Sequence, residues 1–235
     1  MDTGLRHAWT QIVTGEDYDE HMASIGQAQA GADLTCQILG SAAPPAGGCV
    51  VIAGAGTGQA LDFVDPALFR PFRLTFTDLN PAFLARLSRR LDRHGLVASV
   101  LEDDIERTAI KPSPDLLIAT LLLEHIDWHR GVEALTGLQP AACGIVIQEN
   151  PEGMTSAITP GRKLPPSIAK AAEIAHATLV PRQDLVATFA ERGYVCKDTW
   201  TRAVADGKKL VGLLFVQQWP IRQDPVPFRT PSDRE

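Results

Sequence analysis

The sequence predicts an α/β protein with a mostly parallel, doubly wound sheet that is covered by helices on both faces. Short apolar runs typical of buried strands alternate with helical patterns between residues 50 and 193. A glycine-rich turn, 54–58, directly follows the first of these runs. Near the C-terminus, Asp206-Gly207 separates two further strand patterns, 195–205 and 209–218, which predicts a hairpin and therefore one antiparallel strand in the sheet.

The length of the chain fits one such domain with appended segments, since 235 residues with 45% hydrophobic composition can bury a substantial core. We expect an N-terminal helical cap over 1–45 and a sheet domain over 46–219. The stretch 150–181 is longer than a usual connection, which indicates a lid inserted into that domain. The proline-containing segment 220–235 is expected to form an extended tail.

The charge balance argues against several classes of partner. The formal net charge is −6 and the pI is near 5.5, whereas nucleic-acid binding depends on clustered Lys and Arg. No run approaches the ~20 apolar residues of a spanning helix, and the first residues lack the apolar core of a signal peptide. We expect a soluble, cytoplasmic monomer or homodimer that meets no membrane or nucleic acid and acts on a small molecule. The scattered cysteines and histidines form no metal-ligand pattern, so no metal is expected.

The individual elements follow from local patterns in chain order. The segment 17–39 is typical of one or two helices, and 59–64 can begin another. Asn80 is a good helix N-cap and Pro81 suits the first helical position, so a helix is expected after the second strand, 73–78. The other expected elements are strands at 97–101, 115–123 and 144–148, and helices at 127–138, 167–178 and 184–192.

The helix expected after the second strand carries a stripe of leucines on one side, namely Leu84, Leu87 and Leu91. The opposite side carries arginines, which we expect to form a solvated face, as charge runs on helices usually do. These arginines are Arg86, Arg89, Arg90 and Arg93.

The glycine turn predicts a binding loop for a nucleotide-like ligand. Glycine accepts positive φ and lets the backbone approach a ligand, and the free N–H groups at a following helix start favour an anion. The dinucleotide fingerprint requires a small residue three positions after its second glycine, whereas Gln59 is large. The pattern GxGxG therefore differs from a dinucleotide loop.

Three more segments follow this loop in a characteristic order. Asp78 ends the second expected strand, the pair Asp104-Ile105 follows the third, and the run 121–126, Leu-Leu-Leu-Glu-His-Ile, follows the fourth. With the glycine loop, they resemble the motifs of class I S-adenosylmethionine-dependent methyltransferases of the small-molecule branch. The resemblance covers about residues 49–218 and implies a Rossmann-like sheet with S-adenosyl-L-methionine as the cofactor.

The resemblance also implies roles for these residues. Asp78, with Leu79 beside it, would hold the ribose, because a carboxylate can accept from two hydroxyls at once. Asp104 would accept from the adenine amino group while Ile105 packs on the ring, with Asp103 as an alternative to Asp104. The loop residues expected to line the cofactor are Gly54, Ala55, Gly56 and Gly58.

One position departs from the family pattern. The acid usually found two residues before the first glycine is replaced by Ile52. The amino-acid end of the cofactor must then be held by other groups, and Gln27 and Tyr18 of the N-terminal helices are the candidates we predict. Gln27 offers a donor and an acceptor, and the Tyr18 ring could face the sulfonium.

Methyl transfer requires alignment of a nucleophile opposite the departing sulfur and exclusion of water. A base is needed only for a protonated nucleophile. His125 is the first candidate for that base because its ordinary pKa suits proton acceptance near neutral pH, and Glu124 is the second. Arg162 in the lid either binds a substrate anion or is solvated. The expected substrate-pocket residues are His21, Trp128, His129, Gln148, Glu149 and Asn150.

The sequence thus predicts a methyltransferase that moves a methyl group to an O, N or activated C of a small molecule by in-line displacement. A nicotinamide-dependent oxidoreductase is an alternative, although neither Tyr18 nor Tyr194 has a Lys four residues later. A catalytically inactive cofactor-binding protein of the same fold is a second alternative, which the Ile52 substitution keeps open. Methylation of RNA or protein is disfavoured by the acidic balance.

Overall fold

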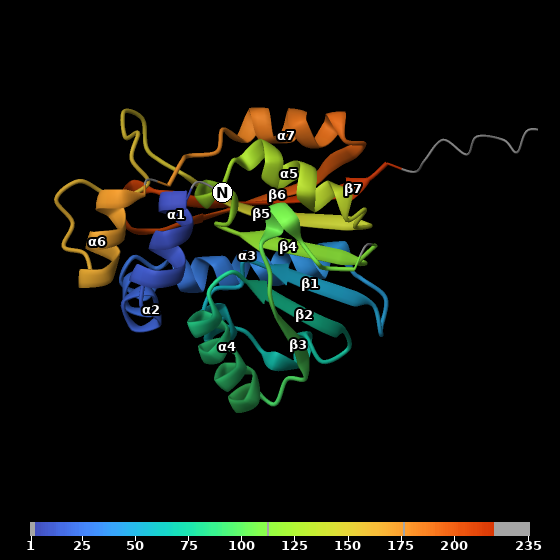
Figure 1. Ribbon diagram of the computed structural model, residues 1–235. Coiled ribbons are helices and arrows are strands. Elements are labelled where there is room, and N and C mark those ends of the chain that lie inside the picture. The colour runs from blue at the N-terminus through green and yellow to red at the C-terminus, as the bar shows by residue number, and fades with distance from the viewer. Residues whose placement is uncertain (1–2, 112, 176, 219–235) are drawn as a thin grey trace, which may run out of the picture.

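Seven strands form one sheet in the order β3-β2-β1-β4-β5-β7-β6 in the computed structural model, which describes residues 3–111, 113–175 and 177–218 (Figure 1). The pairs among β1 to β5 are parallel, and β7 runs antiparallel to both β5 and β6. The predicted doubly wound sheet with an antiparallel C-terminal hairpin is therefore confirmed. The strands are β1 Cys49–Ala53, β2 Arg73–Asp78, β3 Ala98–Glu102, β4 Leu116–Thr120, β5 Ala142–Glu149, β6 Tyr194–Ala203 and β7 Lys209–Gln217.

The chain order reverses between two central strands. β1 pairs with β2 on one side and with β4 on the other, so the connections that leave β1 and β4 depart in opposite directions. In open α/β sheets such a switch point leaves a crevice at the carboxyl ends of the strands, where ligands bind. The glycine loop after β1, the acid that ends β2 and the segment after β4 all meet at this crevice.

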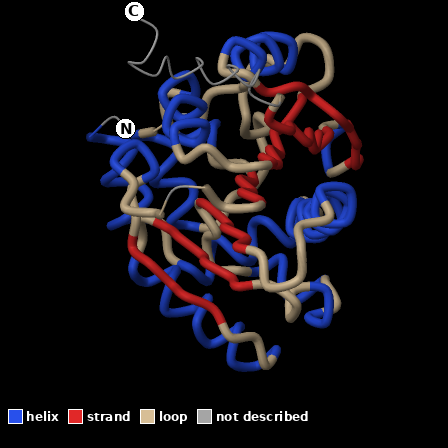
Figure 2. Tube along the Cα trace, turned by 90° about the vertical axis from the view of Figure 1, so that its right-hand side faces the viewer, coloured by secondary structure: helices blue, strands red, loops and turns tan. Residues whose placement is uncertain are grey.

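Helices cover both faces of the sheet, as the view turned by 90° shows (Figure 2). Leu135 of α5 and Phe189 of α7 are fully buried on one face, and Ile38 of α3 and Leu87 of α4 are fully buried on the other. The alternation of side chains along each strand supplies both cores. The helices are α1 Thr3–His7, a π-helical segment Ala8–Ile12, α2 Gly15–Ser24, α3 Gln27–Ala42, α4 Pro81–His94, α5 Trp128–Gly137, α6 Pro166–Ile174 and α7 Arg182–Glu191.

Helix α3 packs unusually close to the sheet because two strand residues lack side chains. A Cβ at Gly144 would lie 2.4 Å from Cγ2 of Ile38, and one at Gly212 would lie 3.2 Å from Cδ2 of Leu34. Larger residues at either strand position would push the helix outward. This close packing fixes the position of Gln27, the first residue of α3, beside the carboxyl ends of the strands.

The N-terminal helices and α6 gather at the carboxyl ends of the strands, on the left in Figure 1. The amide of Ser167 in α6 donates to Oδ2 of Asp17 at 2.6 Å, and the amide of Thr14 donates to Oγ of Ser167 at 3.1 Å. A helix is present where one was expected at 167–178, but it is shorter: α6 ends at Ile174, and Ala175 after it is extended. The segment expected as the lid and the segment expected as the N-terminal cap are therefore in direct contact.

The prediction of a solvated arginine face on α4 is wrong for Arg86 and Arg90. Arg90 is only 8% exposed and donates to Asp62 at 2.9 Å, to Asp19 at 2.6 Å and to the carbonyl of Thr57 at 2.7 Å. Arg86 also donates to Asp19, at 2.8 Å. These contacts come from residues distant in sequence, which a helical pattern cannot show, and they tie α4 to α2 and the glycine loop.

The C-terminal hairpin turns at the predicted dipeptide. Asp206 and Gly207 have φ values of 63° and 70°, as a tight turn between twisted strands requires. Arg162 of the lid donates to both carboxylate oxygens of Asp206, at 2.9 and 2.7 Å, so its side chain fastens the lid to this turn. The predicted extended tail, 220–235, lies outside the described residues. Within the described part of the chain, every helix is too short or too polar to cross a membrane.

Candidate functional site

The glycine loop has backbone angles that residues with side chains rarely adopt. Gly54, Gly56 and Gly58 have φ values of 63°, 58° and 72°. A Cβ at Gly56 would lie 3.2 Å from the Tyr18 ring, so the loop lies in contact with the cap. The amide of Gly56 donates to Oδ2 of Asp78 at 2.8 Å. The loop and the acid at the end of β2 therefore form one unit.

Asp78 is held by backbone donors on both oxygens. Its Oδ1 accepts from the amide of Asn80 at 2.9 Å, while Oδ2 accepts from Gly56. Burial raises the pKa of Asp78 despite these bonds. Because a carboxylate offers about four lone-pair sites, each oxygen can accept a further hydrogen bond. The residue is placed to bind two neighbouring hydroxyl groups.

A cavity, here called the acidic cavity, extends from this unit toward the end of β3. Asp103 accepts from the amide of Ala109 through Oδ1 at 2.7 Å, and its buried Oδ2 has no hydrogen-bond partner among the described residues. Asp104 pairs with Arg6 and accepts from the amide of Glu106 at 3.2 Å. The lining residues are Trp9, Tyr18, Gly54, Gly56, Thr77, Asp78, Leu79, Phe83, Asp103, Asp104, Ile105, Thr120, Leu121, Leu122 and His125.

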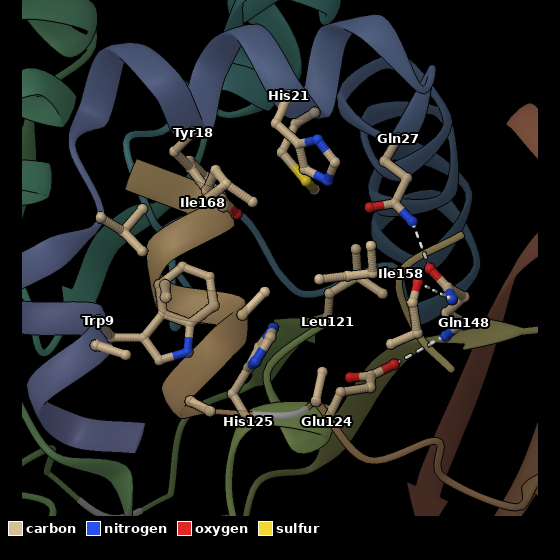
Figure 3. A pocket seen from close by; sticks show the side chains of 18 of the residues that line it. Trp9, Tyr18, His21, Gln27, Leu121, Glu124, His125, Gln148, Ile158 and Ile168 are labelled. Carbon is tan, nitrogen blue, oxygen red and sulfur yellow. Dashed lines mark hydrogen bonds between the residues drawn. The ribbon is translucent and has the colours of Figure 1, made fainter. Parts of the chain in front are cut away.

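A second cavity, here called the apolar cavity, lies under the cap and the lid and has a volume of about 130 Å³ (Figure 3). Most of its lining side chains are apolar. Leu5, Ala8, Trp9, Val13, Tyr18, His21, Met22, Ile25 and Gln27 line it from the N-terminal segment. The other lining residues are Leu121, Glu124, His125, Gln148, Ala157, Ile158, Ile168, Ala171, Ala172, Ala175 and Ala177.

The two cavities share one wall. Trp9, Tyr18, Leu121 and His125 line both of them. The Trp9 ring meets the His125 ring edge to face, with centroids 4.5 Å apart, and also meets the Tyr18 ring edge to face at 5.9 Å. A group bound between these rings is in reach of both cavities.

Leu121 adopts an unusual backbone conformation at this shared wall. Its φ is 53°, in the left-handed region, and its amide donates to the carbonyl of Val146 at 2.8 Å. Such a conformation costs about 1–2 kcal/mol for a residue other than glycine. Strained residues of this kind occur preferentially at functional sites, which supports the location of the site.

Glu124 is the acidic group of the apolar cavity. Glu124 is only 4% exposed. Its Oε1 accepts from the amide of Gln148 at 2.8 Å, and its buried Oε2 has no hydrogen-bond partner among the described residues. Burial raises the pKa of Glu124 to about 7. Its carboxyl group can therefore both donate and accept a proton near neutral pH.

A chain of amides crosses the cavity wall from α3 to the lid. Gln27 donates through Nε2 to Oε1 of Gln148 at 2.6 Å, and its own side-chain oxygen points into the cavity (Figure 3). Gln148 donates in turn to Oδ1 of Asn150 at 2.8 Å and to the carbonyl of Ala157 at 3.1 Å. Gln148 therefore lines the cavity, whereas Asn150 supports the lid behind it.

The two histidines of the cavity are neutral at pH 7. Burial lowers the pKa of His125 to about 4. Burial, together with the positive charges of Arg162 and Lys208, lowers the pKa of His21, whose buried Nδ1 has no hydrogen-bond partner in the described part of the chain. Each ring can accept a hydrogen bond or a proton from a ligand.

A third cavity lies against the other side of the glycine loop. Ile52, which occupies the position of the usual acid, lines it together with Ala55 and Gly58. Gln27 and Tyr18 also line it and connect it to the apolar cavity. Its described lining residues include no charged side chain.

Four predicted substrate residues do not line these cavities, namely Trp128, His129, Glu149 and Asn150. Trp128 begins α5, packs in the core and stacks on His129, with ring centroids 3.6 Å apart. Glu149 pairs with Arg182 at 3.2 Å. Because consecutive strand residues face opposite sides, Gln148 faces the cavity and Glu149 does not.

The sequence patterns did not single out Trp9, Phe83 or Leu121 as site residues. Trp9 lies in a short π-helical segment without clear periodicity. Phe83 lies three positions after Asn80, the N-cap of α4, and five positions after Asp78, and this position in the first turn of the helix was the signal available for it. The positive φ of Leu121 leaves no mark in the sequence.

Known proteins resemble this chain in sequence motif and in fold. Residues 51–139 match a family model described as a methyltransferase domain, and no curated protein matches the sequence. Magnesium protoporphyrin IX methyltransferase from Synechocystis PCC 6803, solved with bound SAH, is similar in structure with a TM-score of 0.62 and 14% identity over 81% of this chain and 83% of that chain.

Two further solved structures are similar at comparable coverage. The [4+2]-cyclase SpnF has a TM-score of 0.61 and 12% identity over 81% of this chain and 82% of that chain. An S-adenosylmethionine-dependent methyltransferase from Clostridium acetobutylicum ATCC 824 has a TM-score of 0.55 and 12% identity over 80% and 90%. At these identities the structures establish a shared fold. Residues 51–139 thus match a methyltransferase domain, and the chain shares its fold with S-adenosylmethionine-dependent methyltransferases, which confirms the resemblance of its motifs.

Proposed function

We propose that the protein transfers the methyl group of S-adenosyl-L-methionine to a small, largely apolar acceptor in the cytoplasm. The observation that carries this proposal is the shared wall of Trp9, Tyr18, Leu121 and His125. It joins an acidic cavity beside a glycine loop to an apolar cavity closed by the cap and the lid. A methyl donor bound in the first cavity would present its methyl group to an acceptor in the second.

The acidic cavity would hold the adenosine. Asp78 would accept from the ribose hydroxyls, and Ile105 would pack on the adenine ring. The sequence favours Asp104 as the acceptor for the adenine amino group, but Asp104 already pairs with Arg6. The unpartnered Oδ2 of Asp103 supports the alternative assignment, in which Asp103 binds the amino group.

The uncharged third cavity would receive the amino-acid end of the cofactor. The amide nitrogen of Gln27 is occupied by Gln148, which leaves its oxygen to accept from the cofactor's ammonium group. Tyr18 lines all three cavities and would lie near the sulfonium, where aromatic rings favour a positive charge. Neutral groups would thereby replace the acid that Ile52 displaces.

The bound cofactor would supply an activated methyl group, and the chain would align the acceptor and exclude water. His125 lies on the shared wall, but burial lowers its pKa to about 4, so it is a weaker base than its ordinary pKa predicts. Glu124, with a pKa of about 7, is the better matched group to take a proton from an acceptor O–H or N–H group. The cavity volume of about 130 Å³ suits a single-ring body, since a dry cavity of about 150 Å³ is enough to bind benzene.

The direct test is calorimetric titration with S-adenosylhomocysteine, followed by transfer of labelled methyl groups into a metabolite extract. We expect binding in the micromolar range, which corresponds to about −8 kcal/mol. Titration with NADH in parallel addresses the oxidoreductase alternative. Binding of NADH without binding of S-adenosylhomocysteine would contradict the proposal.

A further inference from the structure

The carboxyl group of Glu124 is exceptional in its surroundings. Oε2 is buried, points into the apolar cavity and has no hydrogen-bond partner among the described residues (Figure 3). Burying a carboxylate without a partner is costly, so buried acids in proteins are normally paired or hydrogen-bonded. Oε1 accepts from the amide of Gln148, and Oε2 remains available to accept from a ligand.

The surrounding residues do not supply the missing positive charge. The described lining of the apolar cavity contains no Lys or Arg, and its titratable groups besides Glu124 are Tyr18, His21 and His125. Burial disfavours the charged form of all three.

An outer cavity also reaches Glu124, and its other charged residues are Glu106, Asp127 and Arg130. Arg130 is the cation among them, and it is mostly exposed and faces Asp127 at 3.7 Å. Among the described lining residues of the two cavities, no Lys or Arg is paired with Glu124.

We infer that the acceptor is a cationic amine with a ring-sized apolar body, and that its ammonium group donates to Oε2 of Glu124. Transfer of that proton to Glu124 would free the nitrogen lone pair to attack the methyl group, with S-adenosylhomocysteine as the leaving group. This inference rests on the proposed function, in which the apolar cavity holds the acceptor. A charge-assisted bond of this kind is about twice as strong as a neutral one and removes the cost of an unpaired buried charge. The rings of Trp9 and Tyr18 in the same cavity also favour a cation.

Other acceptor classes fit this cavity less well. An alcohol of the same shape can donate to Oε2 but leaves the negative charge of Glu124 uncompensated. A carboxylic acid would place a second negative charge against the first, with no Lys or Arg in the described lining to offset it. The order of affinity expected from the cavity is amine, then alcohol, then carboxylate.

Calorimetry with three matched probes tests this order. Benzylamine, benzyl alcohol and benzoate are titrated at pH 8 into the full chain saturated with S-adenosylhomocysteine. We expect benzylamine to bind at least about tenfold more tightly than benzyl alcohol. Equal affinities, tighter binding of the alcohol, or no binding of any probe to the saturated protein would overturn the inference.

Two variants separate the role of Glu124 from a structural one. Glu124→Gln keeps an oxygen for the amide of Gln148 and replaces Oε2 with a donor, so it should abolish the preference for the amine while leaving S-adenosylhomocysteine affinity within about twofold. Glu133→Gln, which removes an exposed acid that pairs with Arg192, should keep the preference. A preference that survives in Glu124→Gln would refute the assignment. Failure of the wild-type protein to bind S-adenosylhomocysteine would instead refute the proposed function.

Discussion

Replacing Asp78 with Asn tests the cofactor site most directly, because this side chain joins the glycine loop to the end of β2. Its two oxygens accept from the amides of Gly56 and Asn80 at 2.8 and 2.9 Å, and each is proposed to accept from a ribose hydroxyl as well. An asparagine keeps one acceptor oxygen and turns an amide donor toward the other backbone N–H. One backbone bond and one ribose bond are therefore lost.

The magnitudes follow from these losses. A hydrogen bond to a charged group contributes about 1.5–3 kcal/mol. Loss of the ribose bond should weaken S-adenosylhomocysteine binding roughly 10- to 150-fold. Loss of the backbone bond should reduce the free energy of unfolding by a similar amount, which lowers Tm by roughly 3–12 °C for a domain of this size. Affinity is measured by calorimetry and stability by thermal unfolding.

A second aspartate separates the two effects. Asp115 accepts from the amide of Cys49 at 2.7 Å at the opposite end of β1, away from the cavities. Asp115→Ala should lower Tm by a comparable amount and leave the affinity for S-adenosylhomocysteine unchanged. If Asp78→Asn binds as tightly as the wild type, or loses no more affinity than Asp115→Ala, the ribose assignment is refuted.

Four other perturbations test the electrostatics described above. Because burial raises the pKa of Glu124 from 4.5 to about 7, the wild type should gain up to about 3 kcal/mol of stability over Glu124→Gln as the pH falls from 7 to 4.5, measured by urea unfolding; a constant difference would contradict this. The lowered pKa of His125 acts in the opposite direction, so His125→Gln should reduce the loss of stability between pH 6.5 and 4 in the same titration. Arg90→Ala should cost about 3–5 kcal/mol in urea unfolding, whereas the exposed Arg89→Ala should cost less than about 0.5 kcal/mol, and equal costs would disprove the buried role of Arg90. Asp206→Asn should accelerate hydrogen exchange in the segment that follows β5 without changing the affinity for S-adenosylhomocysteine, and unaltered exchange would show that this carboxylate does not fasten the lid.

Local signals predicted most of the fold. Asn80 accepts from the amides of Ala82 and Phe83 as the N-cap of α4, and Asp127 caps α5. The Asp-Gly turn and the buried strand patterns also depend on neighbouring residues alone. Where the predictions failed, the deciding contacts were long-range: the partners of Arg90 lie on α2, in the glycine loop and on the segment after that loop.

The candidate site shows the same division. The glycine loop, Asp78 and the acids after β3 could be predicted because each lies at the end of a strand, in the same order as the motifs of the methyltransferase family. The pairing of Gln27 with Gln148 joins residues more than a hundred positions apart, and it depends on how closely α3 packs on the sheet. No spacing rule predicts such a contact, and the placement of Trp9 above the crevice is of the same kind.

The origin of the cavity walls has a consequence for how specificity can change. The acidic cavity is built mainly from strand ends of the methyltransferase core, whereas much of the apolar cavity comes from the N-terminal helices and the lid. These covering segments lie outside the strands and meet each other through contacts such as those of Asp17 and Thr14 with Ser167. Exchanging the two segments as a matched pair should therefore redirect the enzyme to a new acceptor while the machinery for the methyl donor is inherited unchanged.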